Sequence, residues 1–526
     1  MSKDSSGSFA PTRRNIMQTA AAAAAASTLN FANAKARAQS DKKPNILVIL
    51  PDQYRHDAFG ITGMLSAKTP NFDKIASGGT RFSTTWVQSP VCRPSRASLI
   101  TGRYVPEHGF IHNILDQFDP KWPTMMKSLQ KAGYYTVSCG KTDYHLPQWL
   151  REDGMNGLKN KPPYDSREVY PFLRSFGWDV VHDNAGRNRD AVENYISEYT
   201  EFLKERGLLK VFQWQINSSG GQGKEGLHYQ PHVSLLPQDA ENTSFIANQA
   251  LDWLKDYDGK KPFLLSFSPH SPHVPEIADA IWAHYYLTHP VKLGPRDVPK
   301  SENPICQKWL EGQLRGSDYP ALTDELTEAC LRMYLGMCSL VDQKVGDIMA
   351  LLEKRGWLDN TWIVVLSDHG EMMGDHHMMG KGSFYKASVQ IPGFIRPPKR
   401  PSEREISHPV EMIDMTATIL AIAGAEALPD SKGISLLNAM NGKPISKQAV
   451  FSAISDNKEK QLMAAVRTVD YRYTMEWKTK TPCEFFDMKN DPDELINLIG
   501  DPSKKALIDD HYALLADNMN LPLMKA

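Results

Sequence analysis

The chain has 526 residues, of which 41% are hydrophobic and 23% are charged, and its formal net charge at pH 7 is -1. This ordinary globular composition is sufficient for one large α/β domain with a smaller companion, or for two domains. The balanced charge excludes a general electrostatic attraction to nucleic acid or to an anionic membrane, so anion binding requires a local cluster of basic groups.

The N-terminal 38 residues carry an export pattern. Arg13 and Arg14 precede the alanine run 20–26, and the stretch ends with Ala36-Arg37-Ala38. Paired arginines, a short weakly apolar segment and an A-x-A site are typical of a twin-arginine signal peptide, with a disordered alanine-rich tail as the alternative. No apolar run reaches the roughly 20 residues needed to span a bilayer. We therefore expect a protein without a membrane span, exported folded by the twin-arginine machinery to the periplasm or the medium.

Four short apolar runs have the length and composition of buried strands: Asn45–Leu50, Tyr134–Ser138, Phe263–Ser268 and Trp362–Leu366. Polar residues follow each of these runs. Helical spacing of apolar residues is found over Trp122–Ala132, Ala191–Arg206, Phe245–Tyr257 and Leu326–Arg355. Strands that are apolar throughout and alternate with helices favour an α/β fold with a mostly parallel sheet covered on both faces.

Two segments interrupt this alternation, at residues 149–232 and 280–322. We interpret them as insertions that shape a substrate pocket, with plain surface loops as the alternative. The proline-rich stretch Ile395–Pro401 is interpreted as a connector. From residue 450 short alternating strands and a last helix near Lys505–Asn518 predict a small subdomain. The predicted organisation is a signal peptide over 1–38, a catalytic domain over 41–449 and an α+β subdomain with an antiparallel sheet over 450–526.

The cysteine content is low, and no C-x-x-C pair indicates a zinc or redox site: Cys92, Cys139, Cys306, Cys330, Cys338 and Cys483. An oxidising compartment permits disulfides, but the spacing does not pair these residues. We expect most of them to be buried thiols.

Polar residues follow all four predicted strands, where ligands bind in parallel α/β sheets: Asp52, Lys141, His270 with His273, and Asp368-His369 with Lys381 in the next loop. Taken singly, each has a plain interpretation as a helix cap, a solvated lysine, a loop histidine or a turn residue. Taken together, two carboxylates and an imidazole suit a divalent cation. Two lysines and the arginines after Cys92 suit a tetrahedral oxyanion beside it. This pattern predicts a metal-assisted hydrolase of an anionic ester.

The stretch Cys92-Arg-Pro-Ser-Arg96, followed by Thr101-Gly102-Arg103, resembles the signature of the formylglycine-dependent (type I) sulfatases, C-x-P-S-R with T-G-R behind it. Further blocks resemble the family in the same order: Pro44–Gln53, Thr69–Asp73, Gly140–Lys141, Ser271–Pro275, Ser367–Gly370, Gly380–Tyr385 and Gly433–Leu437. The resemblance covers nearly all of the mature chain. It implies an alkaline-phosphatase-like fold, with a large mixed sheet sandwiched by helices.

The resemblance also implies a chemistry for Cys92. A formylglycine-generating enzyme or an anaerobic sulfatase-maturating enzyme would oxidise it to formylglycine, which is hydrated to a geminal diol. One diol oxygen would attack sulfur and expel the alcohol, and the other hydroxyl would lose its proton, eject sulfate and restore the aldehyde. The implied cation ligands are Asp52, Asp368, His369 and the diol at position 92. In the implied roles, Arg96 steadies the diol, and the sulfate clamp consists of Lys141, His273 and Lys381, with His273 or Lys381 protonating the leaving oxygen.

Three positions depart from the common family pattern. Pro51-Asp52 leaves one carboxylate fewer than the usual pair of adjacent acids, and His369 stands where many members have Asn. Calcium is the first expectation for the cation, with manganese and zinc as alternatives because an imidazole ligand suits them. Asp143 stands where the family often has a histidine, and Gly140-Lys-Thr-Asp-Tyr144 resembles the uronate-2-sulfatase (arylsulfatase K) branch. His145 is a candidate to replace that histidine in space.

The leading prediction is an exported sulfatase acting on a sulfated carbohydrate or a small sulfate ester. A phosphonate or phosphate ester hydrolase with the same site is the second interpretation, because phosphoryl and sulfuryl groups fit similar clamps. A non-catalytic binder of sulfated glycans is the third, and the complete set of site residues argues against it.

Overall fold

The computed structural model describes residues 42–63, 65–113, 117–153, 158, 161–218, 229–399, 403–455 and 461–519. The chain divides into two units, residues 1–44 and 45–526, and the first is described only from residue 42. The signal peptide predicted over residues 1–38 lies outside the described residues. Within the described part of the chain, no helix has both the length and the apolarity needed to cross a membrane.

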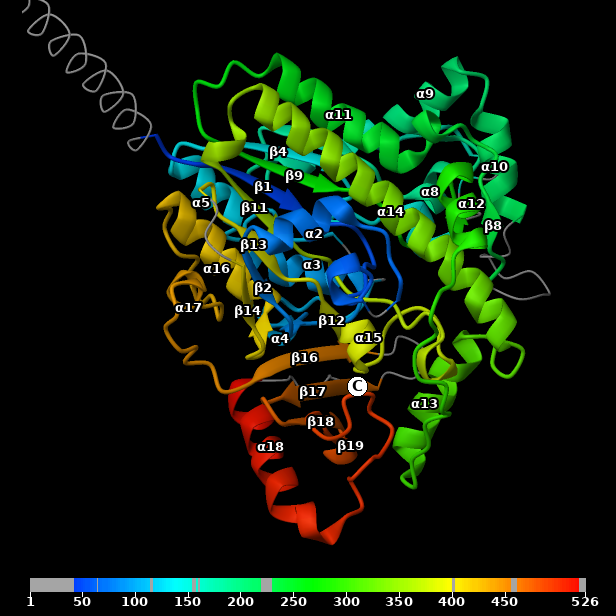
Figure 1. The fold of residues 1–526 in the computed structure, drawn as a ribbon, viewed down its shortest axis with the longest axis vertical. Coiled ribbons are helices and arrows are strands. Elements are labelled where there is room, and N and C mark those ends of the chain that lie inside the picture. The colour runs from blue at the N-terminus through cyan, green and yellow to red at the C-terminus, as the bar shows by residue number, and fades with distance from the viewer. Residues whose placement is uncertain are drawn as a thin grey trace, which may run out of the picture. The chain divides into compact units, whose positions relative to one another are not determined.

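An eight-stranded sheet lies at the centre of the second unit (Figure 1). Its order is β14 (Arg404–Ile406), β2 (Thr80–Phe82), β13 (Phe394–Arg396), β11 (Thr361–Val365), β1 (Asn45–Ile49), β9 (Phe263–Ser268), β4 (Tyr135–Gly140) and β6 (Val180–Asp183). The strands from β11 to β6 are parallel, whereas β13 runs antiparallel to both of its neighbours. This confirms the predicted α/β fold with a mixed, mostly parallel sheet.

Both faces of the sheet are covered, which explains why every residue of β1 after Asn45 is apolar. Ile46 and Val48 belong to a core cluster shared with α3 (Cys92–Thr101), α5 (Met125–Lys131) and α16 (Met412–Ala423). Leu47 and Ile49 point the other way, because successive side chains of a strand alternate between its faces. They pack with α2 (Pro70–Ser77), α11 (Asn242–Asp256) and α14 (Asp324–Lys354).

The two predicted insertions contain helices. Residues 149–232 are not wholly an insertion, because they supply β6, the edge strand that pairs with β4 in the central sheet. They also hold β5 (Tyr164–Asp165), α7 (Tyr170–Arg174), α8 (Arg187–Asp190), β7 (Tyr195–Ile196), α9 (Glu198–Glu205), α10 (Leu209–Ser218) and most of α6 (Gln148–Asp153). Residues 280–322 hold α12 (Ala280–Thr288) and α13 (Pro304–Gly316). The remaining short elements are β3 (Thr85–Trp86), α4 (Val105–His108), β8 (His232–Val233), β10 (Ile277–Ala278), α15 (Lys386–Val389), β12 (Gln390–Ile391), β15 (Val410–Glu411) and α17 (Leu437–Met440).

Two predictions about local structure are wrong. The helix expected from Ala191 begins at Glu198, because the Ser197 side chain accepts a hydrogen bond from the Thr200 amide and caps the helix there. The expected connector Ile395–Pro401 begins with strand residues, since the apolar side chains of β13 are buried inside the sheet.

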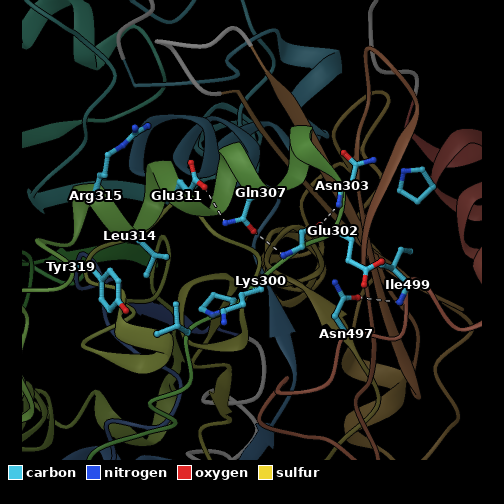
Figure 2. A pocket seen from close by; sticks show the side chains of 15 residues that line it. Lys300, Glu302, Asn303, Gln307, Glu311, Leu314, Arg315, Tyr319, Asn497 and Ile499 are labelled. Carbon is cyan, nitrogen blue, oxygen red and sulfur yellow. Dashed lines mark hydrogen bonds between the residues drawn. The ribbon is translucent and has the colours of Figure 1, made fainter.

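The C-terminal part forms a four-stranded antiparallel sheet, as predicted: β16 (Val450–Ser455), β17 (Leu462–Arg467), β18 (Tyr471–Glu476) and β19 (Thr481–Asp487). Helix α18 (Lys505–Asn518) contacts β17 and β18. A disulfide joins Cys306 in α13 to Cys483 in β19, and the other four cysteines are buried thiols. A groove of 1320 Å³ lies beside this disulfide, lined by α13, the segment before it and the turn around Asn497 (Figure 2).

Candidate active site

Four neighbouring strands deliver the predicted site residues to one edge of the sheet. In the order β11, β1, β9 and β4, their carboxyl ends lead to Asp368 and His369, to Asp52, to His270 and His273, and to Lys141. Parallel strands end at the same edge, so residues far apart in the sequence meet there.

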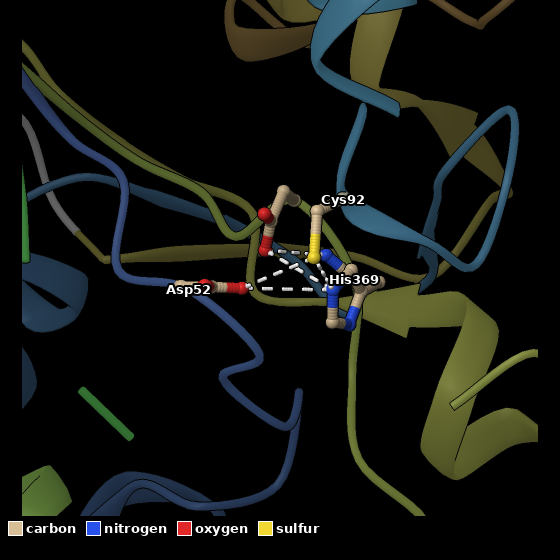
Figure 3. Close-up of side chains that lie close together, drawn as sticks. Asp52, Cys92 and His369 are labelled. Carbon is tan, nitrogen blue, oxygen red and sulfur yellow. Dashed lines mark hydrogen bonds and ion pairs between the residues drawn. The ribbon is translucent and has the colours of Figure 1, made fainter. Parts of the chain in front are cut away.

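The side chains of three strand-end residues converge on one point with that of Cys92 from α3 (Figure 3). The ligand atoms of Asp52, Cys92, Asp368 and His369 lie within 4.8 Å of one another, and all four residues are buried. The Cys92 Sγ is 3.1 Å from His369 Nε2 and 3.8 Å from Asp52 Oδ1. Two carboxylates, an imidazole and a thiol in this geometry form a candidate site for a divalent cation.

His369 is held in the orientation of a metal ligand. Its Nδ1 donates a hydrogen bond to the Gly370 carbonyl at 2.8 Å, so Nε2 is the ring nitrogen that faces the cluster. The Nε2 atom lies 3.6 Å from Asp52 Oδ1 and 3.7 Å from Asp368 Oδ1. The donor set therefore fits a cation without a change in the histidine ring.

Cys92 is the first residue of α3, after an extended Val91. Its thiol thus lies at the helix end where unpaired amides favour a negative charge. Burial and Asp52 raise the pKa of the Cys92 thiol, but nearby cations, Lys141 first among them, outweigh both and hold this pKa well below its usual value. The signature therefore places a group with anionic character at the centre of the site.

One turn further along α3, Arg96 connects three parts of the site. Its Nε donates to Asp368 Oδ2 at 2.8 Å, and its Nη1 donates to the Lys141 carbonyl at 2.6 Å and to the Ser268 hydroxyl at 3.2 Å. Its buried Nη2 has no hydrogen-bond partner among the residues that the structure describes. The guanidinium therefore fixes Asp368 and retains one donor for a further group.

Two lysines bring positive charge to the cluster. Lys141 Nζ lies 2.7 Å from Asp52 Oδ2, and Lys381 Nζ lies 3.1 Å from Cys92 Sγ and 2.6 Å from Gln53 Oε1. Burial by itself raises the pKa of Asp52, but the cations around it, Lys141 first, lower this pKa well below its usual range. The Asp52 carboxylate is therefore charged and available to a cation.

A second group of ligand atoms shares Asp52. The atoms of Asp52, His270 and His273 lie within 4.8 Å of one another, and the two imidazole rings are 4.6 Å apart. Burial lowers the pKa of His270, and His273 and several cations lower it further: Lys141, Arg187 and Lys381. This local positive charge disfavours a second metal ion and suits a bound anion.

The structure brings all eight predicted site residues together: Asp52, Cys92, Arg96, Lys141, His273, Asp368, His369 and Lys381. The ring of His145 packs against that of Phe172, and His145 belongs to neither group of ligand atoms found among the described residues. Sequence reasoning missed Gln53, whose main-chain amide donates to Asp368 Oδ1 at 3.0 Å. Its side chain accepts a hydrogen bond from Lys381 and donates one to Glu371. The signal available for Gln53 was its place directly after Asp52.

Comparison with known proteins decides the family. The sulfatase family profile matches residues 44–425, and a profile described as N-sulphoglucosamine sulphohydrolase, C-terminal, matches residues 374–520. The chain belongs to the sulfatase family. In this sulfatase-family hydrolase, buried Cys92 lies among the candidate cation ligands.

Relatives of this sulfatase-family chain have diverse names. It is 27% identical to the multifunctional alkaline phosphatase superfamily protein PehA of Trinickia caryophylli, over 89% of this chain and 94% of that protein. It is 26% identical to arylsulfatase K of Mus musculus, over 88% of this chain and 77% of that protein. The phosphonate monoester hydrolase of Agrobacterium radiobacter has the same fold, with a TM-score of 0.73 at 23% identity over 90% of this chain and 95% of that chain.

Proposed function

We propose that the protein hydrolyses sulfate esters through a formylglycine made from Cys92, assisted by a divalent cation. The observation that carries this proposal is the position of Cys92 Sγ between cation ligands and an ammonium group. His369 Nε2 and Lys381 Nζ each lie 3.1 Å from it. A cation would stabilise a deprotonated hydroxyl at position 92, and the hydrated formylglycine would supply a second hydroxyl that releases the sulfate.

The surrounding cationic side chains would bind the sulfuryl oxygens. Lys141 and Lys381 approach from two sides, and His273 lies beside Asp52. Charge that develops on the sulfuryl oxygens during the reaction meets donors already in place, and in many enzymes such preorganised donors supply most of the rate enhancement. His273 or Lys381 would donate the proton to the departing alcohol oxygen.

We propose calcium as the first candidate for the cation, held by Asp52, Asp368 and His369. Carboxylate oxygens favour calcium, whereas the imidazole keeps manganese and zinc as the alternatives. Elemental analysis of the purified protein distinguishes the three metals.

The substrate we propose is a sulfated carbohydrate, because the chain resembles the uronate-2-sulfatase (arylsulfatase K) branch of the family. The support is the stretch Gly140-Lys-Thr-Asp-Tyr144 and the relative of that name from Mus musculus. Rates on matched sulfate, phosphodiester and phosphonate esters test this choice. Faster turnover of the phosphorus esters would establish the second interpretation instead.

We further propose export by the twin-arginine route to the periplasm or the medium, with a signal peptide over 1–38 and domains over 41–449 and 450–526. The disulfide between Cys306 and Cys483 supports this, because disulfides persist in oxidising compartments. Edman sequencing of protein isolated from the host envelope checks the cleavage site after residue 38.

Mass spectrometry of the tryptic peptide Phe82–Arg96 tests the central proposal. The Arg93-Pro94 bond resists trypsin, so Cys92 stays inside this peptide. We expect the mass of formylglycine at position 92. An unmodified thiol in protein from the native host rules out the diol mechanism and leaves a sulfated-glycan binder as the function.

A further inference from the structure

Asp143 places a second carboxylate beside Lys141. The Lys141 Nζ lies 2.7 Å from Asp52 Oδ2 and 3.4 Å from Asp143 Oδ2, and all three side chains are buried. Asp52 is also a candidate cation ligand, whereas Asp143 belongs to neither group of ligand atoms found among the described residues. Asp143 therefore gives Lys141 a carboxylate partner that is not also a candidate metal ligand.

Arg189 fixes the other oxygen of this carboxylate. Its guanidinium donates to Asp143 Oδ1 at 3.1 Å, while the Arg93 side chain donates to the Asp143 carbonyl at 3.0 Å. Burial by itself raises the pKa of Asp143, but Lys141 and Arg189 outweigh it, and this pKa lies well below its usual range. The carboxylate is thus charged, and both its backbone and its side chain are held.

Arg189 lies on α8, a short helix that also contacts the opposite side of the site. Arg187 donates to the main-chain carbonyls of His273 and Pro275 at 2.6 and 2.8 Å. The backbone of Gly186 lies against the His270 ring so closely that a Cβ there would be 2.3 Å from Nε2. α8 therefore reaches the loop that carries His273 as well as the partner of Lys141.

We propose that Asp143 and Arg189 are positioning residues for Lys141. Arg189 orients the Asp143 carboxylate, and this carboxylate holds the Lys141 ammonium where it meets an oxygen of the anionic ester. The inference rests on the proposed function, in which Lys141 binds the sulfuryl group. It gives the first insertion, through α8, a part in forming the anion clamp.

The test compares single and double variants of the metal-loaded enzyme, with the formylglycine content checked by mass. Asparagine keeps the shape of Asp143 and tolerates its positive φ of 63°, so Asp143→Asn is expected to fold. We expect Asp143→Asn and Arg189→Ala each to lower kcat for 4-nitrophenyl sulfate about 100-fold, because small misplacements of a catalytic group cost this much. The double variant should be no slower than Asp143→Asn alone, because the two residues act in series.

Arg189→Lys supplies the rescue, and we expect it to recover most of the kcat lost in Arg189→Ala. Arg206→Ala is the matched control, since Arg206, on the same insertion, forms a partly exposed ion pair with Asp239. The inference is overturned if the losses multiply in the double variant, if kcat is unchanged, or if every loss of kcat follows a loss of folded protein.

The competitive inhibition constant of inorganic sulfate separates this inference from the proposed function. If the wild-type protein turns over no sulfate ester, the proposed function fails, and the inhibition is then measured against the ester it does hydrolyse, or as direct binding. Weaker sulfate binding in Asp143→Asn and Arg189→Ala, but not in Arg206→Ala, still supports the positioning role. Equal binding in all variants contradicts it.

Discussion

Arg96 holds two different partners with one planar group, through Nε to Asp368 and through Nη1 to the Lys141 carbonyl. A lysine at this position offers a single ammonium and cannot reproduce the fork. We expect Arg96→Lys to lower kcat/KM about 100-fold, with the melting temperature nearly unchanged. Steady-state kinetics check this, and Arg174→Lys, at an exposed position of α7, is the matched control.

Asp368 is a buried carboxylate with three roles, since it accepts from Arg96 and from the Gln53 amide and faces the cation cluster. Asp368→Asn removes the charge with little change of shape. We expect loss of the bound cation by elemental analysis and at least a 1,000-fold drop in kcat, about 4 kcal/mol of transition-state stabilisation. Retention of the metal at full stoichiometry would show that Asp368 is not a ligand. Asp359→Asn, at an exposed position, serves as the comparison.

The convergence of residues at strand ends could be predicted from the sequence, because a parallel sheet brings them to one edge regardless of the loop conformations. Asp52, Lys141 and Asp368 are of this kind. The contacts of Gln53 and Asp143 could not be predicted in this way. Both residues have a positive φ, at 65° and 63°, so the conformation of the folded loop determines the direction of their side chains. Asp143 pairs with Lys141 two residues before it, but Arg189 and the partners of Gln53 lie on distant segments that the sequence does not place.

At the scale of elements, α11 begins beside a buried carboxyl group. Glu241 precedes the helix, and within the described residues its Oε1 has no hydrogen-bond partner. Burial outweighs a side-chain hydrogen bond with Ser234 and the charge of Arg187, and it raises the pKa of Glu241 from 4.5 to about 7. The folded protein therefore binds this proton more tightly than the unfolded chain does. Stability is predicted to fall as the pH rises from about 4.5 to about 7 and to level off above that range.

Glu241→Gln removes this titration. We expect its melting temperature to match or trail the wild type near pH 4.5 and to exceed it by a few degrees, about 1 kcal/mol or more, at pH 8. Differential scanning calorimetry across this range checks the prediction. A constant difference between the two proteins at every pH would show that Glu241 does not titrate between pH 4.5 and 8.

Elements with strong periodicity were predictable, and those set by local capping were not. α14 and α11 follow their predicted ranges within three residues, because their apolar spacing is long and regular. The helix expected from Ala191 instead starts at Glu198, where Ser197 caps it, and Tyr195–Ile196 pairs with another short strand. Such short pairings depend on contacts outside the local sequence.

For the whole molecule, the disulfide between Cys306 and Cys483 joins residues separated by 177 positions. Closing so long a loop removes much entropy from the unfolded chain, up to about 5 kcal/mol. We expect Cys306→Ser to lower the melting temperature by several degrees while activity at 25 °C is retained. Dithiothreitol should lower the melting temperature of the wild type and leave that of the variant unchanged. Equal melting temperatures of oxidised and reduced wild type would contradict this.

The same bond sets an order of events during biogenesis. Position 483 leaves the ribosome 177 residues after position 306, so the disulfide between α13 and β19 cannot form until almost the entire chain has been synthesised. If the folded protein leaves a reducing cytoplasm, the disulfide closes only after export, whereas the proposed oxidation of Cys92, a residue buried in the fold, would have to precede folding. Cys92 would thus be oxidised first, inside the cytoplasm, and Cys306 and Cys483 last, outside it. The groove beside α13 would acquire its final walls only outside the cytoplasm.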